Sequence, residues 1–321
     1  MKVSVIATVK NEGEGIRPLL DSLIHQSRIP DEIIICDGGS TDNTLEILAE
    51  YQQWLPLKII VVPGANISQG RNRAIEVATG EIIAATDAGV VLAPYWLEDI
   101  VRPIEMGEAV VVSGWFEPDP YTDFEVVMGA TVLPAREDVD PQKFLPSSRS
   151  VAFLKTAWEA VGGYPEWLDY GEDLVFDLAL REKYGPFPLV DTAVAYFRPR
   201  SNLRSYFRQY YTYARGDGKA NLWPKRHAIR YLTYLVALPV ILRLIWREKI
   251  LGWLLLLGGI SAYCRRPAER LWQSTASWSP AGRVRAFALI PIIRFVGDVA
   301  EMLGYPVGLW WRWHHRSQKE G

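Results

Sequence analysis

Glu32-Ile33-Ile34-Ile35-Cys36-Asp37-Gly38-Gly39-Ser40 is the stretch of this sequence that decides its fold. A continuous apolar run followed at once by an acid and two glycines is typical of a buried strand that ends in a tight loop. A second apolar run, Ile82–Thr86, ends in the same way at Asp87. Because the carboxyl ends of parallel strands gather at one edge of a sheet, where ligands bind, we expect Asp37 and Asp87 to face one site.

Strands and helices alternate around these two runs through the first 200 residues. The predicted strands are 3–9, 32–36, 58–62, 81–86, 109–113 and 193–197. The predicted helices are 15–26, a helix after Asp42, 70–79, 151–160 and 174–181, whereas the proline-rich stretch 115–149 predicts loops and irregular strands. This alternation predicts an α/β fold with a mostly parallel sheet flanked by helices.

Charge divides the chain into two parts. Residues 1–197 contain 14 Lys+Arg and 31 Asp+Glu, whereas residues 198–321 contain 21 and 6. Eight of the 13 tryptophans also follow residue 220. Such asymmetry indicates two regions with different surroundings, and we predict an α/β domain over 1–222 and a helical region over 223–321.

The helical region has the composition of a segment that associates with a membrane. Residues 231–246 are apolar except for Arg243, and the 15 residues of 250–264 carry no charge. Each stretch is shorter than the roughly 20 residues that cross a bilayer. Residues 286–296 are a third apolar piece, interrupted by Pro291 and Arg294, and the tail 310–316 mixes Trp with Arg, which suits a headgroup layer. We expect an in-plane or shallow hairpin, or two short crossings, with a basic collar facing anionic lipid; the alternative is a helical pair packed in a soluble protein.

The start of the chain and its cysteines indicate a reducing compartment. Residues 2–9 predict a strand, followed at once by Lys10-Asn11-Glu12, rather than a signal peptide. The two cysteines, Cys36 and Cys264, lie far apart, and Cys36 is expected to be a buried small hydrophobe. We therefore expect the protein at the cytoplasmic face of the cell membrane.

Three further positions carry candidate chemistry, each with a plain structural alternative. Arg71 can meet a phosphate bidentately or lie on a solvated helix face with Arg73. Asp87, at the end of a buried strand, can bind Mg²⁺ or Mn²⁺ on a nucleoside diphosphate or merely cap a turn. Asp173, next to Glu172 at the start of a helical run, can act as a general base or as an N-cap residue. The sequence lacks the glycine-rich phosphate loops of dinucleotide-binding and P-loop proteins.

Taken together and in order, these motifs resemble those of family 2 glycosyltransferases, which use nucleotide sugars and have the GT-A fold. The matching stretches are Ser4–Glu12, Asp37–Asp42, Arg71-Asn72 before Ala78–Glu81, Thr86–Ala88, and Gly162–Pro165 leading to Glu172-Asp173. The resemblance covers about residues 2–185. It implies that Asp173, with Glu172 beside it, is the base of a single inverting displacement, and that the remaining matched positions bind the nucleotide sugar. Of these positions, Thr8, Glu12 and Asp37 would contact the nucleoside, and Arg71 and Asp87 would lie near the diphosphate and metal. Asn11, Gly38 and Ala88 complete the set that would bind the nucleotide sugar.

One departure from the family pattern concerns the metal. The family usually has a second acid two residues after the first, and this chain has Gly89 there. Asp87 then binds the metal with water filling the gap, another residue such as His227 replaces the missing ligand, or the metal is dispensable. Arg208 and Arg215 are further candidates for neutralising the diphosphate. Residues 209–213 also lack the Gln-x-x-Arg-Trp motif of processive members, which favours addition of a single sugar.

The sequence thus predicts an inverting glycosyltransferase that transfers one sugar to a lipid-linked or polysaccharide acceptor at a membrane, with no nucleic acid as partner. The alternative is a catalytically silent scaffold that binds nucleotide sugars at the membrane. A nucleotidyltransferase is disfavoured, because Lys10–Glu14 is a poor match to the basic glycine-rich loop that such enzymes place after the first strand.

Overall fold

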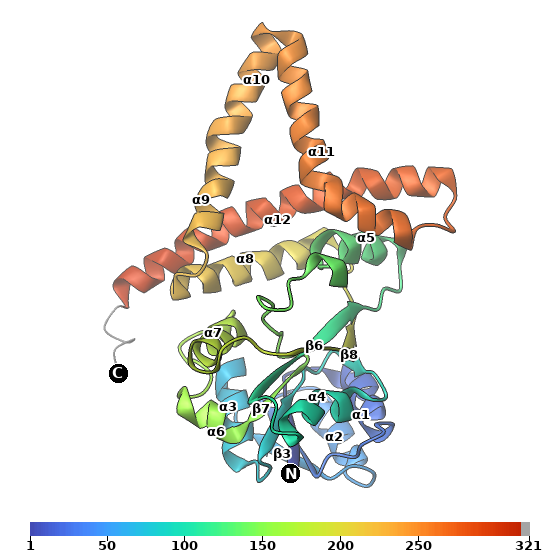
Figure 1. Ribbon diagram of the computed structural model, residues 1–321, viewed down its shortest axis with the longest axis vertical. Helices are drawn as coiled ribbons and strands as arrows, with labels where there is room; N and C mark the ends of the chain where they lie inside the picture. Colours follow the sequence, from blue (N-terminus) through green and yellow to red (C-terminus); the bar gives the residue numbers. More distant parts are fainter. Residues whose placement is uncertain (316–321) are drawn as a thin grey trace. The chain divides into compact units, whose positions relative to one another are not determined.

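The computed structural model describes residues 1–315 (Figure 1). The chain forms two compact units. An α/β unit contains residues 1–119 and 137–198, and a helical unit contains residues 120–136 and the chain from residue 199 onward. The predicted boundary after residue 222 lies inside the helical unit, and residues 316–321 of the predicted helical region lie outside the described residues.

The α/β unit is built on one sheet of eight strands in the order β3-β2-β1-β4-β7-β6-β8-β5. The strands are β1 (Val3–Val9), β2 (Glu32–Asp37), β3 (Leu57–Val61), β4 (Ile82–Ala85), β5 (Val90–Leu92), β6 (Val111–Pro118), β7 (Val151–Leu154) and β8 (Leu189–Phe197). β1 to β4 pair in parallel, as the alternating pattern predicts. β7 runs antiparallel to both of its neighbours, β4 and β6, and β5 runs antiparallel to β8, so the sheet as a whole is mixed.

Two strands correct the predicted elements. Residues 151–160 were predicted to be one helix, but Val151–Leu154 is a strand and only Lys155–Ala160 (α6) is helical. The first three side chains of this strand are buried between β4 and β6, and a short apolar run carries no periodicity that separates it from a helix. The three-residue strand β5 was not predicted, because three residues are too few for any pattern to show.

Helices cover both faces of the sheet because side chains alternate along each strand. Val3, Val5 and Ala7 of β1 pack in a core with α1 (Arg17–Ile24), α2 (Thr44–Tyr51) and α4 (Trp96–Glu105). Ile6 of the same strand belongs to the opposite core, with α3 (Ile67–Val77), α6 and α7 (Glu172–Tyr184). A short 3₁₀ turn, Gly13–Ile16, precedes α1, and another lies at Arg136–Asp138. This two-sided packing is the predicted α/β architecture.

The helical unit contains α5 (Asp123–Val132), α8 (Leu203–Ala220), α9 (Pro224–Leu232), a π-turn (Thr233–Ala237), α10 (Leu238–Arg247), α11 (Lys249–Ser274) and α12 (Pro280–His314). Side chains from α5, α8, α11 and α12 form its core. α5 lies within the stretch that was predicted to be irregular, since the surrounding prolines obscure a helix of only ten residues.

Prolines inside these helices do not break them. Residues 286–296 were predicted to be an interrupted segment, but Pro291 and Pro306 lie within the continuous 35-residue helix α12. A proline leaves the carbonyl four residues earlier without its helical donor. For Pro306 this carbonyl belongs to Met302, and the Tyr231 hydroxyl donates to it at 2.7 Å. The π-turn just before Pro239 adjusts the backbone in a similar place.

Candidate functional site

The loop after β2 uses Asp37 to hold its own shape. Asp37 is fully buried, and its Oδ1 accepts hydrogen bonds from the backbone N–H groups of Gly39 and Ser40, both at 2.8 Å. Its Oδ2 accepts a further bond from the Ser40 hydroxyl. A carboxylate has about four acceptor sites, so one remains on Oδ2. The motif is therefore a turn that Asp37 holds together, and a nucleoside contact has one acceptor site left to use.

The loop after β1 is fastened to the Asp37 loop. Asn11 adopts a left-handed backbone with φ of 55°, and its Oδ1 accepts from the Thr41 N–H at 2.8 Å. The Glu12 N–H donates to the Thr44 hydroxyl at 3.0 Å. Gly38, through its N–H, bonds to the Val9 carbonyl at 2.9 Å, where β1 ends. The structure thus brings Asn11, Glu12, Asp37 and Gly38 together at one sheet edge.

Thr8 lies beside this edge, on β1. A Cβ built on Gly70 of α3 would come within 2.8 Å of the Thr8 methyl group, so the glycine allows α3 to approach the strand closely.

Arg71 is the centre of the site. A capping box between Asn66 and Gln69 begins α3, and Arg71 follows within its second turn. The Arg71 side chain is 2% exposed, and its Nη1 donates to Glu172 Oε1 at 2.6 Å while its Nη2 donates to Asp87 Oδ1 at 2.9 Å. Its guanidinium also lies 5.3 Å from the centre of the Tyr164 ring. The alternative of a solvated helix face therefore describes Arg73, which pairs with Glu76, and not Arg71.

Asn72 explains why the Gly-Gly-Tyr-Pro motif precedes the acidic pair. The Asn72 amide donates to the Tyr164 carbonyl and its oxygen accepts from the Tyr164 N–H, both at 2.8 Å. Gly163 has φ of 78°, and a Cβ there would lie 2.9 Å from the Asn72 oxygen. Two segments are therefore attached to α3. Asn72 holds the Gly-Gly-Tyr-Pro turn, and Arg71 holds the helix that begins with the acidic pair.

Asp87 stands at the end of β4 between two arginines. Its Oδ1 pairs with Arg71, its Oδ2 lies 3.7 Å from Arg149 Nε, and its side chain is 27% exposed. Ala88 is buried next to it, whereas a Cβ on Gly89 would meet nothing within 4 Å. Asp87 is therefore an ion-paired carboxylate with open space two residues further on.

The acidic pair opens α7. Gly171, with φ of 76°, is the N-cap residue, so neither Glu172 nor Asp173 takes the N-cap position that was the alternative for Asp173. Glu172 is buried against Arg71, whereas Asp173 is partly exposed. Asp173 Oδ1 accepts from the Leu174 N–H at 2.8 Å, and within residues 1–315 its Oδ2 has no hydrogen-bond partner. Asp173 thus presents one carboxylate oxygen to a ligand.

Burial and mutual repulsion raise the pKa of two acids in this cluster. Burial first, and the charge of Asp173 second, raise the pKa of Glu172 to about 7. Asp177, one helical turn after Asp173, is fully buried, and its Oδ2 has no partner in the described chain. Burial, followed by the charge of Asp173, raises the pKa of Asp177 well above its usual range. Both acids therefore resist ionisation next to Asp173.

Three further residues of this cluster were not predicted to belong to the site: Arg149, Tyr164 and Asp177. Arg149 and Asp87 lie 62 residues apart in sequence, so only the antiparallel pairing of β7 with β4 brings Arg149, two residues before β7, to the end of β4. Asp177 follows Asp173 at helical spacing, and that spacing was the one available signal.

The two predicted metal ligands, Asp87 and His227, differ in the protein groups that already contact them. In the helical unit, His227 Nε2 lies 3.1 Å from Asp217 Oδ2 and His227 Nδ1 lies 3.2 Å from Arg230 Nη1, so a metal would have to displace one of these partners. Over residues 1–315 no group of three His, Cys, Asp or Glu side chains is placed to hold an ion. Asp87 is a single hard-oxygen ligand beside open space, and this fits an ion whose other ligands are diphosphate oxygens and water.

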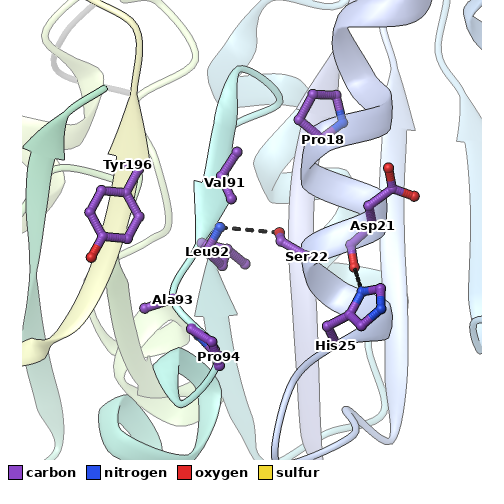
Figure 2. Close-up of a pocket in the computed structure, with 9 residues that line it drawn as sticks. All are labelled: Pro18, Asp21, Ser22, His25, Val91, Leu92, Ala93, Pro94 and Tyr196. Carbon is purple, nitrogen blue, oxygen red and sulfur yellow. Dashed lines mark hydrogen bonds between the residues drawn. The ribbon is translucent and has the colours of Figure 1, made fainter. Parts of the chain in front are cut away.

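A shallow hollow of about 440 Å³ lies away from these residues. Figure 2 shows its lining, which comes from α1, from β5 and its following turn, and from Tyr196. The Leu92 N–H donates to Ser22 at 3.1 Å across it. The hollow contains none of the predicted site residues, and its lining is mainly apolar.

The mixed sheet with helices on both faces, together with the acids around Arg71 at its edge, corresponds to the GT-A fold of nucleotide-sugar transferases. Two solved structures support this class. A mannosyltransferase from Pyrobaculum calidifontis, in complex with GDP-Man and Mn²⁺, matches with a TM-score of 0.58 and 19% identity over 97% of this chain and 87% of that one. TarS 1–349 of S. aureus, in complex with UDP-GlcNAc, matches with a TM-score of 0.51 and 19% identity over 98% and 92%. At this identity the likeness concerns the fold.

Sequence relatives give the family. Residues 4–145 match the profile described as glycosyl transferase family 2, and this part of the chain belongs to that family. The uncharacterised glycosyltransferase YibD of Escherichia coli is 40% identical over 101 residues, which are 31% of this chain and 29% of YibD. A poly(ribitol-phosphate) β-glucosyltransferase of Bacillus spizizenii is 36% identical over 95 residues, 27% of this chain and 15% of that protein. The matched segment spans about a third of the length of the first curated relatives.

Proposed function

We propose that the protein transfers one sugar from a nucleoside diphosphate sugar to an acceptor hydroxyl, with inversion at the anomeric carbon. The main support for this proposal is that Arg71 forms ion pairs with both Asp87 and Glu172. Asp87 lies at the sheet edge that also carries the loops after β1 and β2, where we place the donor, and Glu172 is the neighbour of the proposed base, Asp173. One buried guanidinium thus fixes the distance between the donor side and the side of the base. Positioning of this kind supplies a large part of catalysis in group transfer.

In the proposed step, the acceptor oxygen attacks the anomeric carbon and forms a new C–O bond. The bond from that carbon to the diphosphate oxygen breaks, and its electron pair leaves with the nucleoside diphosphate. The acceptor proton passes to Asp173 Oδ2, the oxygen without a protein partner. Burial raises the pKa of Glu172 and of Asp177, so these two acids add little negative charge beside the position where the proton is accepted.

We place the nucleoside at Thr8, Asn11, Glu12, Asp37 and Gly38, and the diphosphate near Arg71, Asp87, Ala88 and Arg149. Asp87 would hold a Mg²⁺ or Mn²⁺ ion together with diphosphate oxygens. When bound, such an ion neutralises charge on the leaving diphosphate. Arg149, which lies beside Asp87, is a second source of positive charge at the same position.

The helical unit supports an acceptor at a membrane. Residues 224–247 are long and apolar enough to cross a bilayer, and none of the apolar window within them is buried in the structure. The region is also strongly basic, which favours anionic lipid. We therefore propose a lipid-linked or polysaccharide acceptor and a place at the cytoplasmic face of the cell membrane, where nucleotide sugars are made.

The alternative is a scaffold that binds nucleotide sugars without turnover, and Gly89 is the feature that favours it. Release of nucleoside diphosphate, screened over UDP-, GDP- and dTDP-sugars with membrane lipid extracts as acceptor, separates the two. In the transferase, Asp173→Asn lowers turnover by about 10²–10⁴-fold, while calorimetry gives donor affinity close to that of the unchanged protein. Donor binding without release of product by the unchanged protein favours the scaffold, and full turnover by Asp173→Asn removes Asp173 as the base.

A further inference from the structure

The hairpin of α10 and α11 exposes apolar side chains over most of its surface, and Arg243, one turn from the tip, is the one charged residue of 235–246. Leu242 and Trp246 on α10, and Leu254 and Leu257 on α11, are more than half exposed. The exposed apolar residues of the two arms are Leu235, Val236, Val240, Leu242, Trp246, Ile250, Leu251, Trp253, Leu254, Leu255, Leu257 and Ile260. Helices with so much exposed apolar surface lie in a protein core or in lipid, and in the described part of the helical unit no protein core surrounds this hairpin.

α12 presents a second apolar surface that runs along its length. Its exposed large apolar residues recur at mostly helical spacing: Val284, Ile292, Phe295, Leu303, Val307, Leu309, Trp310 and Trp313. The opposite face carries Gly297, Gly304 and Gly308, where a Cβ would collide with Tyr206, Tyr211 and Arg215 of α8. Figure 1 shows the hairpin leaving α12 on the side away from α8. The stripe on α12 and the hairpin therefore belong to one apolar surface, with α8 behind it.

Polar contacts join both arms of the hairpin to α12. Asp298 Oδ1 accepts from Arg230 Nε at 2.7 Å, and Asp298 Oδ2 accepts from the Tyr234 hydroxyl at 2.8 Å. The Tyr263 hydroxyl of α11 also donates to Asp298. Near the tip, the arms touch at Gly252, where a Cβ would meet the Ile245 backbone at 2.2 Å. The hairpin is thus fixed at its root and closely packed at its tip, as small residues allow in membrane helices.

The lengths of these parts add up to the thickness of a bilayer core. From Leu235 to Trp246 the arm rises about 18 Å at 1.5 Å per residue, and α12 lying flat adds a helix diameter of about 10 Å. The sum is close to the roughly 30 Å of hydrocarbon in a bilayer. At the far end, Trp246 and Trp253 are the aromatic residues, and Arg247 and Lys249 are the cations that can extend to phosphate groups.

From these observations we infer that the hairpin crosses the bilayer as two short antiparallel helices, with residues 247–249 at the far headgroup layer and α12 lying flat just inside the near one. The occupant of the apolar surface is therefore lipid. Trp246 and Trp253 mark the far boundary, and the side of α12 that packs on α8, at Gly297, Gly304 and Gly308, marks the near one. This inference rests on the membrane association proposed above and settles how that association is made.

Cysteine accessibility tests the crossing. Glu248→Cys at the tip and Arg265→Cys, where α11 returns to the root, are each made in a Cys264→Ser background, since Cys36 is buried. Sealed membrane vesicles of both orientations from a bacterial host are treated with a membrane-impermeant maleimide. We expect the two cysteines to be labelled in opposite orientations. Labelling of both in the same orientation overturns the crossing and leaves membrane association standing.

A charged substitution tests the lipid-facing surface separately. Leu257→Arg places a charge within the apolar arm, and we expect at least a tenfold smaller fraction of protein to float with vesicles of phosphatidylethanolamine and phosphatidylglycerol. Ile29→Arg is the matched control, because Ile29 is 71% exposed in the α/β unit. Unchanged flotation of Leu257→Arg, or failure of the original protein to float, overturns the inference. Neither assay requires turnover, so the transferase proposal stands or fails on its own measurement.

Discussion

Arg71 in the α/β unit and Arg230 in the helical unit each hold two carboxylates. Arg71 binds Asp87 and Glu172 at 2.9 and 2.6 Å. Arg230 binds Asp298 and Glu301 at 2.7 and 2.6 Å. The two clusters therefore begin from the same charge-assisted contacts, and they differ in what surrounds those contacts.

Around Arg230 the charges are matched and the remaining acceptors are occupied. Arg226 lies 3.6 Å from Glu301, and the hydroxyls of Tyr234 and Tyr263 donate to Asp298. Around Arg71 there is an excess of acid, since Asp173 and the unpartnered Asp177 follow Glu172 on the same helix. A closed cluster stabilises a structure, whereas an excess of buried acid has a cost in stability and is common at functional sites.

The largest expected effects come from removing each arginine. Arg71→Met and Arg230→Met each leave one buried and one partly buried carboxylate without their cation, which costs roughly 3–5 kcal/mol. Hydrogen exchange should report the loss in α3 and α7 for Arg71→Met, and in α9 and α12 for Arg230→Met. Arg71→Met alone should also lower the rate constant of sugar transfer, by about 10²–10³-fold.

Arg73→Met is the control for this pair, because Arg73 lies on the same helix and pairs only with exposed Glu76. It should change neither exchange nor turnover. Equal loss of turnover in Arg71→Met and Arg230→Met would remove the distinction between a functional and a structural cluster.

The second effect is a pH dependence of the stability of the α/β unit, which comes from Glu172 in the Arg71 cluster. The pKa of Glu172 rises from 4.5 in the unfolded chain to about 7 in the folded one. The folded state therefore binds the proton more tightly. Its advantage is complete below about pH 4.5 and is lost as the pH rises through about 7, by up to about 3 kcal/mol. Glu172→Gln should flatten this dependence in denaturant unfolding of the α/β unit, and Glu46→Gln, on the exposed face of α2, should leave it unchanged.

Much of this site was predictable because its parts occur in local motifs. Asp37, Arg71, Asp87 and Asp173 each follow a strand or begin a helix within a short segment, so their order along the chain indicated one sheet edge. The structure brings Arg71, Asp87 and Glu172 into direct contact. The motifs did not show that Arg71 forms ion pairs with two acids. Asp87 and Glu172 lie 16 and 101 positions after Arg71, and pairing over such separations leaves no local sequence signal.

The remaining errors have physical causes of the same kind. Val151–Leu154 is a strand because β4 and β6 lie on either side of it, and this tertiary context outweighs local pattern. α12 continues through Pro291 and Pro306, because neighbouring groups, such as the Tyr231 hydroxyl, replace missing backbone donors. The sequence indicated an apolar and basic helical region correctly, but its internal packing depends on glycines whose partners lie about 90 residues away.

The third prediction is that removing one carboxylate charge raises stability in the Arg71 cluster and lowers it in the Arg230 cluster. Asp177→Asn removes a buried carboxyl that ionises more readily in the unfolded chain than in the folded one, because burial raises its pKa, so we expect the α/β unit to gain about 1–2 kcal/mol at pH 7–8. Asp298→Asn removes the charge that Arg230 requires and should cost the helical unit about 1–3 kcal/mol. Denaturant titration in detergent, followed by hydrogen exchange in each unit, measures both. A loss of stability in Asp177→Asn would mean that its carboxyl has a bonding role.

A substitution at Gly89 should have the smallest effect on stability, and it gives the most direct test of whether a metal ion binds at Asp87. A side chain fits there, since a Cβ meets nothing within 4 Å, so Gly89→Asp should change the unfolding free energy by less than about 0.5 kcal/mol. If Asp87 holds an ion beside the donor diphosphate, a second carboxylate two residues away should tighten Mn²⁺ binding in the presence of donor by about tenfold, which equals about 1.4 kcal/mol. Calorimetric titration of Mn²⁺ measures this, with Gly89→Asn as the uncharged control of the same shape. Because a charge at residue 89 acts on an ion only at short range, equal Mn²⁺ affinity in both variants would mean that the ion does not bind at Asp87, and that Arg71 and Arg149 are the cations that face the diphosphate.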